Sequence, residues 1–402
     1  MRIPVLFLDQ QAWRAGGQRV LEDVLEALRE DIDPIVAFPE DGPFAATLRS
    51  RGVETLFYPL GSYRPGRKSV GEMLAFPIRS LVCGLKLARV VRQRGIRLIY
   101  INGPRCLPAG VLAARLTGAP SIFHLHRALT RRLDVLITGR AAARVSRILA
   151  VSQAAADSLV RTNPRLAGTT QVIYNPLRSP ARTTSLELAN AAPPALPVGG
   201  GPVIGMVGRI TPQKGQLVML RATALLRESW PNLEIVFVGA PEPGSARDVA
   251  YLRELNAEIT RLGLGDNVHW AGFQENLDSH YARFDAVAIP SIEAEGFSLV
   301  ALEALAWGVP AVASRGGGIE EIIRDGVSGL LVPPGDEKAL AVALAGVLGD
   351  ATLRTRLVAG TRTSLNQRFS PETFRTAIRG IVSELVSPSR ELPGEKEIEA
   401  RV

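Results

Sequence analysis

The chain has 402 residues, 46% hydrophobic and 21% charged, so its composition is that of a soluble globular protein and its length suits two or three domains. Two cysteines, Cys83 and Cys106, and four histidines exclude a disulfide scaffold and a four-thiolate metal site. No stretch approaches 18 consecutive apolar residues, and the opening MRIPVLFLDQ is too short for a signal sequence, so we expect a cytoplasmic protein.

The charge is divided unevenly along the chain. Residues 1–201 contain 27 Lys and Arg against 14 Asp and Glu, a net charge of +13, whereas the remaining residues contain 20 against 25, a net charge of −5. The segment 64–147 alone holds 17 basic residues and two acids. A field of one sign predicts an anionic partner: a nucleic acid, a membrane surface or a substrate. A genome that favours Arg is the alternative explanation.

Short β-branched and apolar runs alternate with longer helical patterns, which predicts an α/β fold with parallel sheets. In the first half we expect strands at residues 3–8, 34–38, 54–58, 97–101, 120–125, 147–151 and 170–173. Helical patterns separate them, among them residues 17–29, 81–94, 108–117 and 153–161. A second series of strands follows at residues 203–208, 234–239, 267–271, 285–289, 309–313 and 329–332.

A segment rich in Pro and Gly and poor in large apolar side chains separates the two series. We therefore expect a Rossmann-like domain over residues 1–180, a linker at 181–201 and a second Rossmann-like domain over 202–370, with a cleft between the domains. Residues 371–388 are expected to form a helix that returns to the first domain, and the charged tail 389–402 is expected to be flexible. Ligands of such sheets bind at the carboxyl ends of the strands.

The densest group of candidate binding residues lies in PSIEAEGFSLVALEALAWGVPAV. After a predicted strand the chain turns at Glu295 and Gly296 and enters a helix over residues 298–307, whose free N–H groups in the first turn suit a phosphate. Glu303 lies ~12 Å from Glu295 along a helix axis, so one carboxylate is placed to hold ribose hydroxyls and the other to meet a sugar. Two solvated acids beside a core helix are the alternative, and the apolar neighbours of Glu303 count against it.

Two further candidate segments contain glycines and cations. GRITPQKG follows a predicted strand and presents Arg209 and Lys214, and paired cations stabilise a departing diphosphate; surface cations without a ligand are the alternative. AGGQRV places Gly16 and Gly17 at a helix start, where the backbone approaches a ligand closely, although an ordinary turn has the same sequence. No G-x-G-x-x-G occurs in the chain, which argues against an NAD enzyme.

Together these segments resemble the retaining GT-B glycosyltransferases of family four, the glycosyl transferases group 1. The resemblance spreads over most of the chain and is carried by the Glu295–Glu303 pair with the following LEALAWGVPAVAS, by GRITPQKG and by GGIEEIIRDGVSGLLVPPGD. Weaker matches are the glycine pair at 16–17, HLHR at 124–127, AVSQAAADSL at 150–159 and IYNP at 173–176.

The resemblance implies that the second domain binds a nucleotide-sugar donor and that the first domain binds the acceptor. By analogy Arg209 and Lys214 neutralise the diphosphate, Glu303 holds the ribose, and Glu295 contacts the donor sugar. The other implied donor-binding positions are Gly16, Gly17, Gly296, Phe297, Ser298 and Leu299.

The resemblance also implies a histidine beside the transferred sugar. Strand alternation in SIFHLH favours His126 over His124 for this position, and a structural histidine is the alternative. Relatives of this type retain anomeric configuration without an enzymic nucleophile, so the protein orients the reactants and stabilises the leaving group. Neither a metal nor another cofactor is implied, and the D-x-D at 31–33 is interpreted as chance.

Several positions depart from the family pattern. Gln18 and Arg19 stand where an acid often follows the glycine pair, Arg127 replaces a common Asp, and Ser298 replaces a frequent Gly. These departures leave the acceptor open.

We expect a glycan or lipid-linked acceptor and, by family analogy, a role in bacterial cell-surface polysaccharide synthesis such as that of lipopolysaccharide. The basic first half predicts peripheral contact with an anionic membrane surface on its cytoplasmic face, although residues 78–94 are as well explained as a buried helix. A nucleic-acid-binding protein is disfavoured because the basic span has few aromatic residues. A nucleotide-sugar epimerase and a non-catalytic scaffold remain alternatives.

Overall fold

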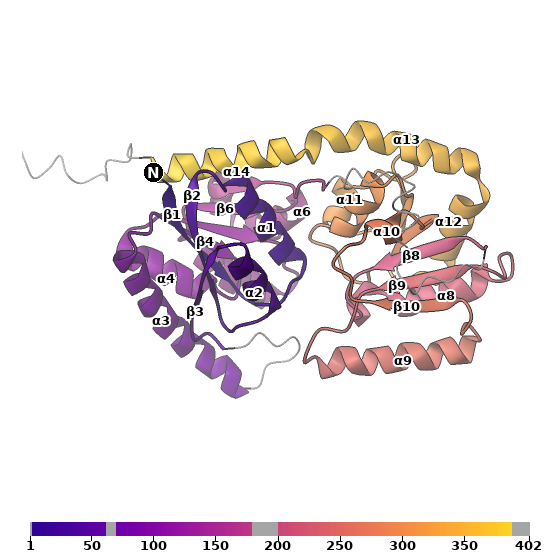
Figure 1. Ribbon diagram of the computed structural model, residues 1–402, viewed down its shortest axis with the longest axis horizontal. Coiled ribbons are helices and arrows are strands. Elements are labelled where there is room, and N and C mark those ends of the chain that lie inside the picture. The colour runs from indigo at the N-terminus through magenta and orange to yellow at the C-terminus, as the bar shows by residue number, and fades with distance from the viewer. Residues whose placement is uncertain (1, 62–69, 179–199, 388–402) are drawn as a thin grey trace, which may run out of the picture.

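The computed structural model of the protein describes residues 2–61, 70–178 and 200–387. The expected tail at 389–402 and all but the last two residues of the expected linker at 181–201 lie outside these residues. Figure 1 shows two lobes side by side, an N-terminal lobe and a C-terminal lobe, each built around one sheet.

The N-terminal lobe contains a parallel sheet of seven strands in the order β3-β2-β1-β4-β5-β6-β7. These strands are β1 (Ile3–Asp9), β2 (Ile32–Phe38), β3 (Glu54–Phe57), β4 (Leu98–Asn102), β5 (Ser121–Leu125), β6 (Arg147–Ala150) and β7 (Thr170–Val172). Every residue of β4 and β5 is buried. Parallel strands covered on both faces need such continuous apolar runs.

Helices cover both faces of this sheet. One face packs against α3 (Val70–Gln93), α4 (Leu107–Thr117), α5 (Arg132–Ala142) and α6 (Gln153–Val160). The other face packs against α1 (Gly16–Ala27), α2 (Pro43–Ser50) and α14 (Pro371–Val386). A short 3-10 helix at Pro164–Thr169 leads into the last strand of the sheet.

The C-terminal lobe contains a parallel sheet of six strands in the order β10-β9-β8-β11-β12-β13. These strands are β8 (Val203–Val207), β9 (Glu234–Val238), β10 (Val268–Gly272), β11 (Ala286–Ile289), β12 (Ala311–Ser314) and β13 (Leu330–Val332). The helices of the lobe are α8 (Gln216–Leu226), α9 (Ala246–Leu262), α10 (Asp278–Tyr281), α11 (Leu299–Ala306), α12 (Glu337–Gly349) and α13 (Ala351–Arg368). Short 3-10 helices lie at Pro212–Lys214 and Gly318–Glu321.

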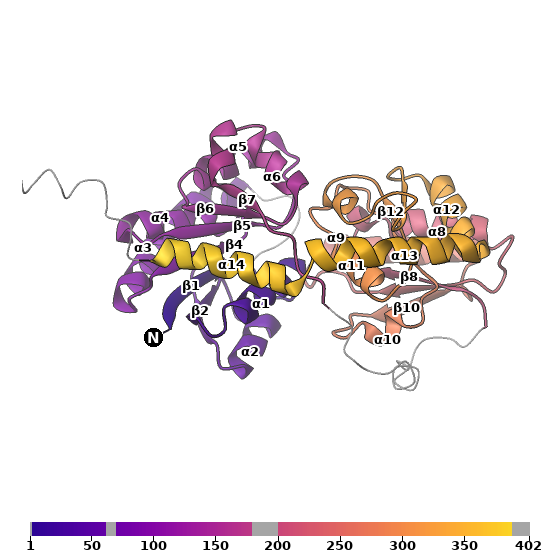
Figure 2. The ribbon, with the colours of Figure 1, turned by 90° about the horizontal axis from the view of Figure 1, so that it is seen from above.

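The last helix belongs to the N-terminal lobe by its packing. Figure 2 shows α13 and α14 crossing the two lobes end to end. The apolar face of α14, which includes Phe374 and Ile378, packs into the same core as α1 and α2. Arg97 Nη2 donates to the carbonyl oxygen of Val386 over 2.9 Å, and Arg379 pairs with Asp31 at 2.8 Å. The final helix thus ties the end of the chain to the first sheet.

The expected fold class is confirmed: two Rossmann-like parallel sheets form the molecule, and all thirteen expected strands are present within a few residues. The helix expected at 81–94 is longer and begins at Val70. The helix expected at 298–307 is α11, with Ser298 as its N-cap. The helices without an individual prediction are α2, α5, α8, α9, α10, α12 and α13.

Candidate functional site

The N-terminus of α11 carries a half-buried ion pair. Lys214 Nζ donates to Glu295 Oε1 over 2.6 Å, and the Ser291 hydroxyl donates to the same oxygen over 2.5 Å. Burial favours the neutral form of Glu295, but the Lys214 charge and hydrogen bonds from Ser291 and Ser298 outweigh it and lower the pKa of the carboxyl. Glu295 is therefore ionised at neutral pH and held in one position.

Glu303 lies farther along α11 and connects the two lobes. Its side chain is buried, as its apolar neighbours indicated, and Glu303 Oε2 accepts a hydrogen bond of 3.0 Å from the Tyr281 hydroxyl. Its other oxygen pairs with Arg19 of α1. Arg19 is one of the residues that depart from the family pattern, so this ion pair is a feature of the present chain.

Arg209 does not join the other expected donor-binding side chains in this structure. Its guanidinium pairs with Glu242, which follows β9, and the Arg209 side chain is 47% exposed. Lys214 and Glu295 therefore contact each other, while Arg209 is held outward.

Three segments distant in sequence meet beside the start of α11. A Cβ atom on Gly17 would lie 3.4 Å from His126 Cδ2, and one on Gly16 would lie 3.9 Å from Leu299 Cδ1. A Cβ atom on Gly296 would lie 2.3 Å from Arg127 Cα, so only glycine permits this contact between the lobes. The glycine pair, His126 and the α11 N-terminus thus form one contact region.

The two histidines of HLHR have different surroundings. His124 is fully buried in β5, where its Nδ1 lies 2.7 Å from the Tyr100 hydroxyl. His126 follows β5, contacts Gly17, and its Nε2 lies 2.6 Å from Asn102 Oδ1. Burial lowers the pKa of His126 to about 4, so its ring is neutral at pH 7. His126, rather than His124, lies where the lobes meet.

Asp9 and Asn102 are polar residues of this region that the sequence analysis did not select. Asp9 is fully buried at the end of β1, and burial raises the pKa of its carboxyl to about 6, partly offset by hydrogen bonds from Asn102, Gln11 and Gln18. Each residue ends an apolar strand, IPVLFLD and LIYIN. A polar residue at the carboxyl end of a parallel strand is the signal that would have identified both.

Glu321 is a second link between the lobes that was not predicted. Its carboxylate accepts hydrogen bonds from the backbone N–H groups of Gln153 (2.8 Å) and Ala154 (2.9 Å) at the start of α6. A carboxylate at a helix N-terminus is favourable because it satisfies free N–H groups and opposes the helix dipole. Ser152 adds a hydrogen bond of 2.6 Å to the Gly296 carbonyl oxygen.

The side chains of the remaining expected residues, Phe297 and Ser298, pack in the core or cap α11. Phe297 is buried, with its ring 6.2 Å from that of Tyr174 and 5.8 Å from that of Phe369, so its side chain contributes to packing. Ser298 Oγ accepts from the backbone N–H of Ala301 at 3.4 Å. Within residues 2–61, 70–178 and 200–387, no group of three or more His, Cys, Asp or Glu side chains is arranged to hold a metal ion.

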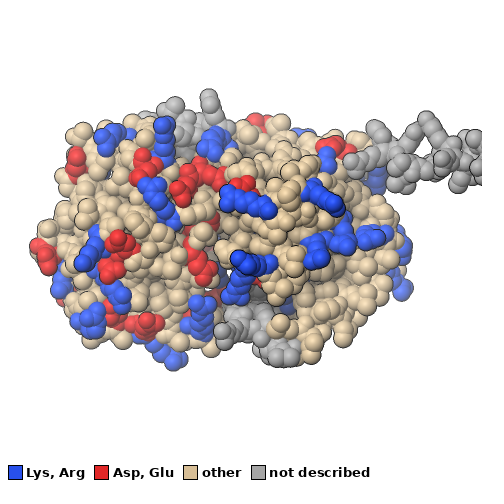
Figure 3. Space-filling view, turned by 180° about the vertical axis from the view of Figure 1, so that it is seen from behind, with Lys and Arg blue, Asp and Glu red and all other residues tan. Residues whose placement is uncertain are grey.

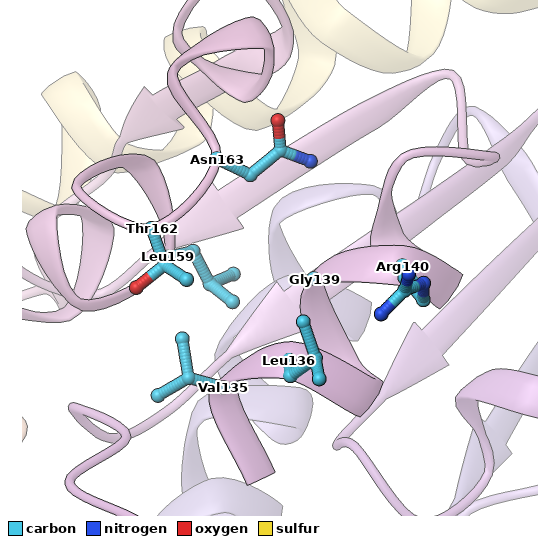
Figure 4. Close-up of a pocket in the computed structure, with 7 residues that line it drawn as sticks. All are labelled: Val135, Leu136, Gly139, Arg140, Leu159, Thr162 and Asn163. Carbon is cyan, nitrogen blue, oxygen red and sulfur yellow. The ribbon is translucent and has the colours of Figure 1, made fainter. Parts of the chain in front are cut away.

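A separate hollow of about 250 Å³ lies between α5 and α6 on the N-terminal lobe (Figure 4). Its lining is mostly apolar and consists of Val135, Leu136, Gly139, Arg140, Leu159, Thr162 and Asn163. None of these residues belongs to the contact region described above.

Comparison with known proteins covers both lobes. Residues 14–178 match the family model Glycosyltransferase Family 4, and residues 192–364 match the family model Glycosyl transferases group 1. A D-inositol 3-phosphate glycosyltransferase from Saccharomonospora viridis is 33% identical over 400 residues, covering 94% of this chain and 91% of that protein. A protein of the same name from Stackebrandtia nassauensis is 42% identical over 166 residues, covering 39% of this chain and only 36% of the length of that relative.

The fold comparison agrees with the family models. The crystal structure of Anabaena HepE in complex with UDP-glucose superposes with a TM-score of 0.81 and 27% sequence identity. The superposition covers 95% of this chain and 100% of that chain, so both lobes have the same arrangement in the two proteins.

Proposed function

The chain belongs to glycosyltransferase family four, the glycosyl transferases group 1, with the GT-B fold, and on that basis we propose that it transfers a sugar from a nucleotide-diphosphate donor to a hydroxyl group with retention of anomeric configuration. The observation that carries the proposal is the half-buried Lys214–Glu295 pair at the N-terminus of α11, opposite Gly17 and His126. It combines a fixed cation, a fixed carboxylate and free N–H groups in one place, which is what a sugar diphosphate requires.

Each side chain has a part in this proposal. Lys214 and the N–H groups of the first turn of α11 stabilise the charge that develops on the departing diphosphate. Glu295 accepts hydrogen bonds from hydroxyls of the donor sugar, and Glu303 accepts them from the ribose. Arg209 joins the diphosphate only after it leaves Glu242. The glycine pair lets the N-terminal lobe come close to the transferred sugar, and His126 lies beside it.

The chemical class of the acceptor is a separate proposal from the donor. We propose a glycan or lipid-linked acceptor used in cell-surface polysaccharide synthesis, as expected from the sequence. A phosphorylated inositol-type acceptor is a second candidate, because relatives are named D-inositol 3-phosphate glycosyltransferases. Arg127 favours it: this side chain is exposed next to Gly296 and has no ion pair among the described residues.

Thermal-shift binding and turnover test the donor site. We expect one UDP- or GDP-linked sugar to raise the melting temperature without a metal and to release its nucleoside diphosphate only when an acceptor is present. Glu295→Gln should abolish turnover while the protein stays folded, and Glu293→Gln, an exposed residue two positions away, is the matched control. Interconversion of sugars without an acceptor would favour an epimerase, and unchanged turnover of Glu295→Gln would overturn the assignment.

We also propose that the N-terminal lobe contacts an anionic membrane surface. Cys83, Leu87 and Val91 bury one face of α3, whereas its outer face exposes Met73, Leu74, Ile78, Leu81, Val82 and Leu85 by 40–70%. The basic residues Arg79, Lys86 and Arg89 are exposed on the same helix. Figure 3 shows Lys and Arg side chains predominating over the N-terminal half on that view of the molecule. No helix in the described residues is both long and apolar enough to cross a bilayer.

Vesicle flotation tests the membrane proposal. We expect binding to vesicles that contain phosphatidylglycerol and little binding to phosphatidylcholine alone, because each basic residue near an anionic surface contributes about 1 kcal/mol. Replacing Ile78 and Leu85 together by Glu should weaken binding at least about tenfold. Val342→Glu, an equally exposed change on α12 of the other lobe, is the control and should have no effect. Equal binding by both variants would overturn the proposal.

A further inference from the structure

Three neighbouring strands of the N-terminal sheet carry a chain of buried polar side chains at their carboxyl ends. Asp9 ends β1, Asn102 ends β4 and pairs with Asp9 in the sheet register, and His126 follows β5. The order β1-β4-β5 in the sheet places the three side chains in line. Asn102 Nδ2 donates to Asp9 Oδ2 over 2.6 Å, and Asn102 Oδ1 lies 2.6 Å from His126 Nε2.

The surroundings of Asn102 determine which way its amide is turned. Asn102 Nδ2 is directed at the Asp9 carboxylate and at the Gly17 carbonyl oxygen, 3.3 Å away, and both of these groups accept hydrogen bonds. The opposite orientation would bring the Asn102 oxygen against two acceptors. Asn102 Oδ1 therefore faces His126, and Nε2 must be the donor in that hydrogen bond.

The position of the His126 proton follows from this arrangement. The ring is neutral at pH 7, so a proton on Nε2 leaves Nδ1 without one. His126 Nδ1 is buried and has no hydrogen-bond partner among the described residues. An acceptor atom left unpaired at the contact between the lobes is matched by a hydroxyl group of the reactants.

We infer that Asp9 and Asn102 are positioning residues that hold His126 in the Nε2–H tautomer, which keeps Nδ1 available to accept a hydrogen bond from a sugar hydroxyl. The role in transfer rests on the proposed glycosyltransferase function, whereas the tautomer does not depend on it. Gln18 supports the arrangement, because its Nε2 donates to Asp9 Oδ1 over 2.8 Å and holds the carboxylate in place.

The variant Asp9→Asn tests the inference without changing the size of the side chain. The backbone N–H of Gln11 and the amide of Gln18 both donate to Asp9 Oδ1, so the single oxygen of the new amide is retained on that side. Its NH₂ group then faces Asn102, which must turn over and present NH₂ to His126 Nε2. The histidine proton is thereby displaced to Nδ1.

Long-range ¹H–¹⁵N correlation spectra of protein labelled at histidine report the tautomer directly, and only four histidines contribute. We expect the Nε2–H pattern for His126 in the unmodified protein and the Nδ1–H pattern in Asp9→Asn, with His126→Gln to assign the signal. Tyr100→Phe is the matched control, since it removes the partner of His124 and should leave His126 unchanged. A His126 tautomer that is the same with and without Asp9→Asn would overturn the inference.

Kinetics add a second measurement. In Asp9→Asn we expect kcat to fall about tenfold, the factor that corresponds to one lost hydrogen bond, with little change in the dissociation constant of the nucleoside diphosphate. A tautomer change with unaltered kcat would overturn the positioning role alone. If no sugar is transferred even by the unmodified protein, the proposed function fails and the tautomer result still stands.

Discussion

The two surfaces that meet between the lobes are built from different kinds of side chain. On the C-terminal surface the candidate residues are charged, and each charge is already paired: Lys214 with Glu295, Arg209 with Glu242 and Glu303 with Arg19. On the N-terminal surface they are glycines, a neutral imidazole and a carboxylate whose pKa is raised by burial. One surface is organised by ion pairs and the other by the hydrogen-bonded chain of Asp9, Asn102 and His126.

Under the proposed function, the difference indicates that one surface binds the diphosphate and the other lies beside the transferred sugar. A diphosphate brings charge, so the surface that receives it needs cations held in place before the ligand arrives, and hydrogen-bonded pairing with carboxylates holds them there. The surface beside the transferred sugar needs direction rather than charge, because hydroxyls are recognised by the placement of donors and acceptors. Variants that change one of the two surfaces therefore show whether the other surface responds.

The largest effect is expected from Lys214→Ala, which leaves the Glu295 carboxylate without its cation while its side chain is only 11% exposed. Removing one partner of a buried ion pair costs about 3 kcal/mol or more, and because Lys214 is 29% exposed we expect a loss of unfolding free energy of about 3 kcal/mol. Urea denaturation measures this loss, and Lys338→Ala, an exposed lysine on α12, is the control.

The double variant Lys214→Ala with Glu295→Gln removes both charges and should recover most of the stability, although not the turnover. A single variant as stable as the unmodified protein would mean that Glu295 is satisfied by Ser291 and Ser298 alone, and the ion pair would lose its organising role on this surface.

The second effect is the pH dependence of stability that arises from Asp9 and His126 on the N-terminal surface. The folded state raises the pKa of Asp9 from 3.8 to about 6, so it binds more protons than the unfolded state in this range, and stability falls as the pH rises from about 4 to 6. The pKa of His126 is lowered from 6.5 to about 4, so its contribution has the opposite sign: stability rises with pH over the same range. The two dependences oppose each other in the unmodified protein.

Asp9→Asn removes the pH dependence that comes from Asp9 and leaves the one that comes from His126. The difference in unfolding free energy, unmodified protein minus Asp9→Asn, should fall by about 3 kcal/mol between pH 4 and pH 7. Denaturation curves at several pH values measure this difference. Parallel curves for the two proteins would show that Asp9 titrates normally and is not the buried carboxylate described here.

Some features of the fold and of the candidate site could be predicted from the sequence, and others could not. The apolar runs predicted the thirteen strands of the described residues, because a parallel strand covered on both faces consists mainly of apolar residues. The family resemblance assigned Lys214 and Glu295 to one donor site, and the two side chains contact each other in the structure. The pairing of Arg209 with Glu242 could not be predicted from the sequence, since the direction of a long exposed side chain depends on a loop that is distant in sequence. Asp9 and Asn102 meet only because β1 and β4 are neighbours in the sheet, which neither strand reveals alone.

The third prediction separates the two surfaces physically. In Gly296→Ala the added Cβ would lie 2.3 Å from Arg127 Cα and 2.5 Å from the His126 carbonyl oxygen, both backbone atoms that have little room to move. We expect a loss of about 1–3 kcal/mol from overpacking, together with a larger radius of gyration in small-angle X-ray scattering as the lobes move apart. Gly265→Ala, with no atom within 4 Å of the added Cβ, is the control and should scatter as the unmodified protein does. An unchanged radius would mean that the lobes are already apart in solution.

The smallest effect is expected from Arg19→Ala, which removes the ion pair with Glu303 that joins the N-terminal surface to the C-terminal one. The side chains of this pair are 26% and 11% exposed, much like those of the Lys214–Glu295 pair, but the Tyr281 hydroxyl still donates to Glu303 when Arg19 is removed. The loss should therefore be about 1 kcal/mol of stability, the contribution of one hydrogen bond. A carboxylate accepts about four hydrogen bonds, and Arg19 and Tyr281 use two, which leaves two for the ribose hydroxyls. Calorimetry should therefore give a nucleoside diphosphate affinity within about threefold of the unmodified value, whereas Glu303→Ala should weaken binding at least about tenfold. Tighter binding in Arg19→Ala would show instead that Arg19 competes with the ribose, and the two surfaces would then be coupled through Glu303 rather than independent.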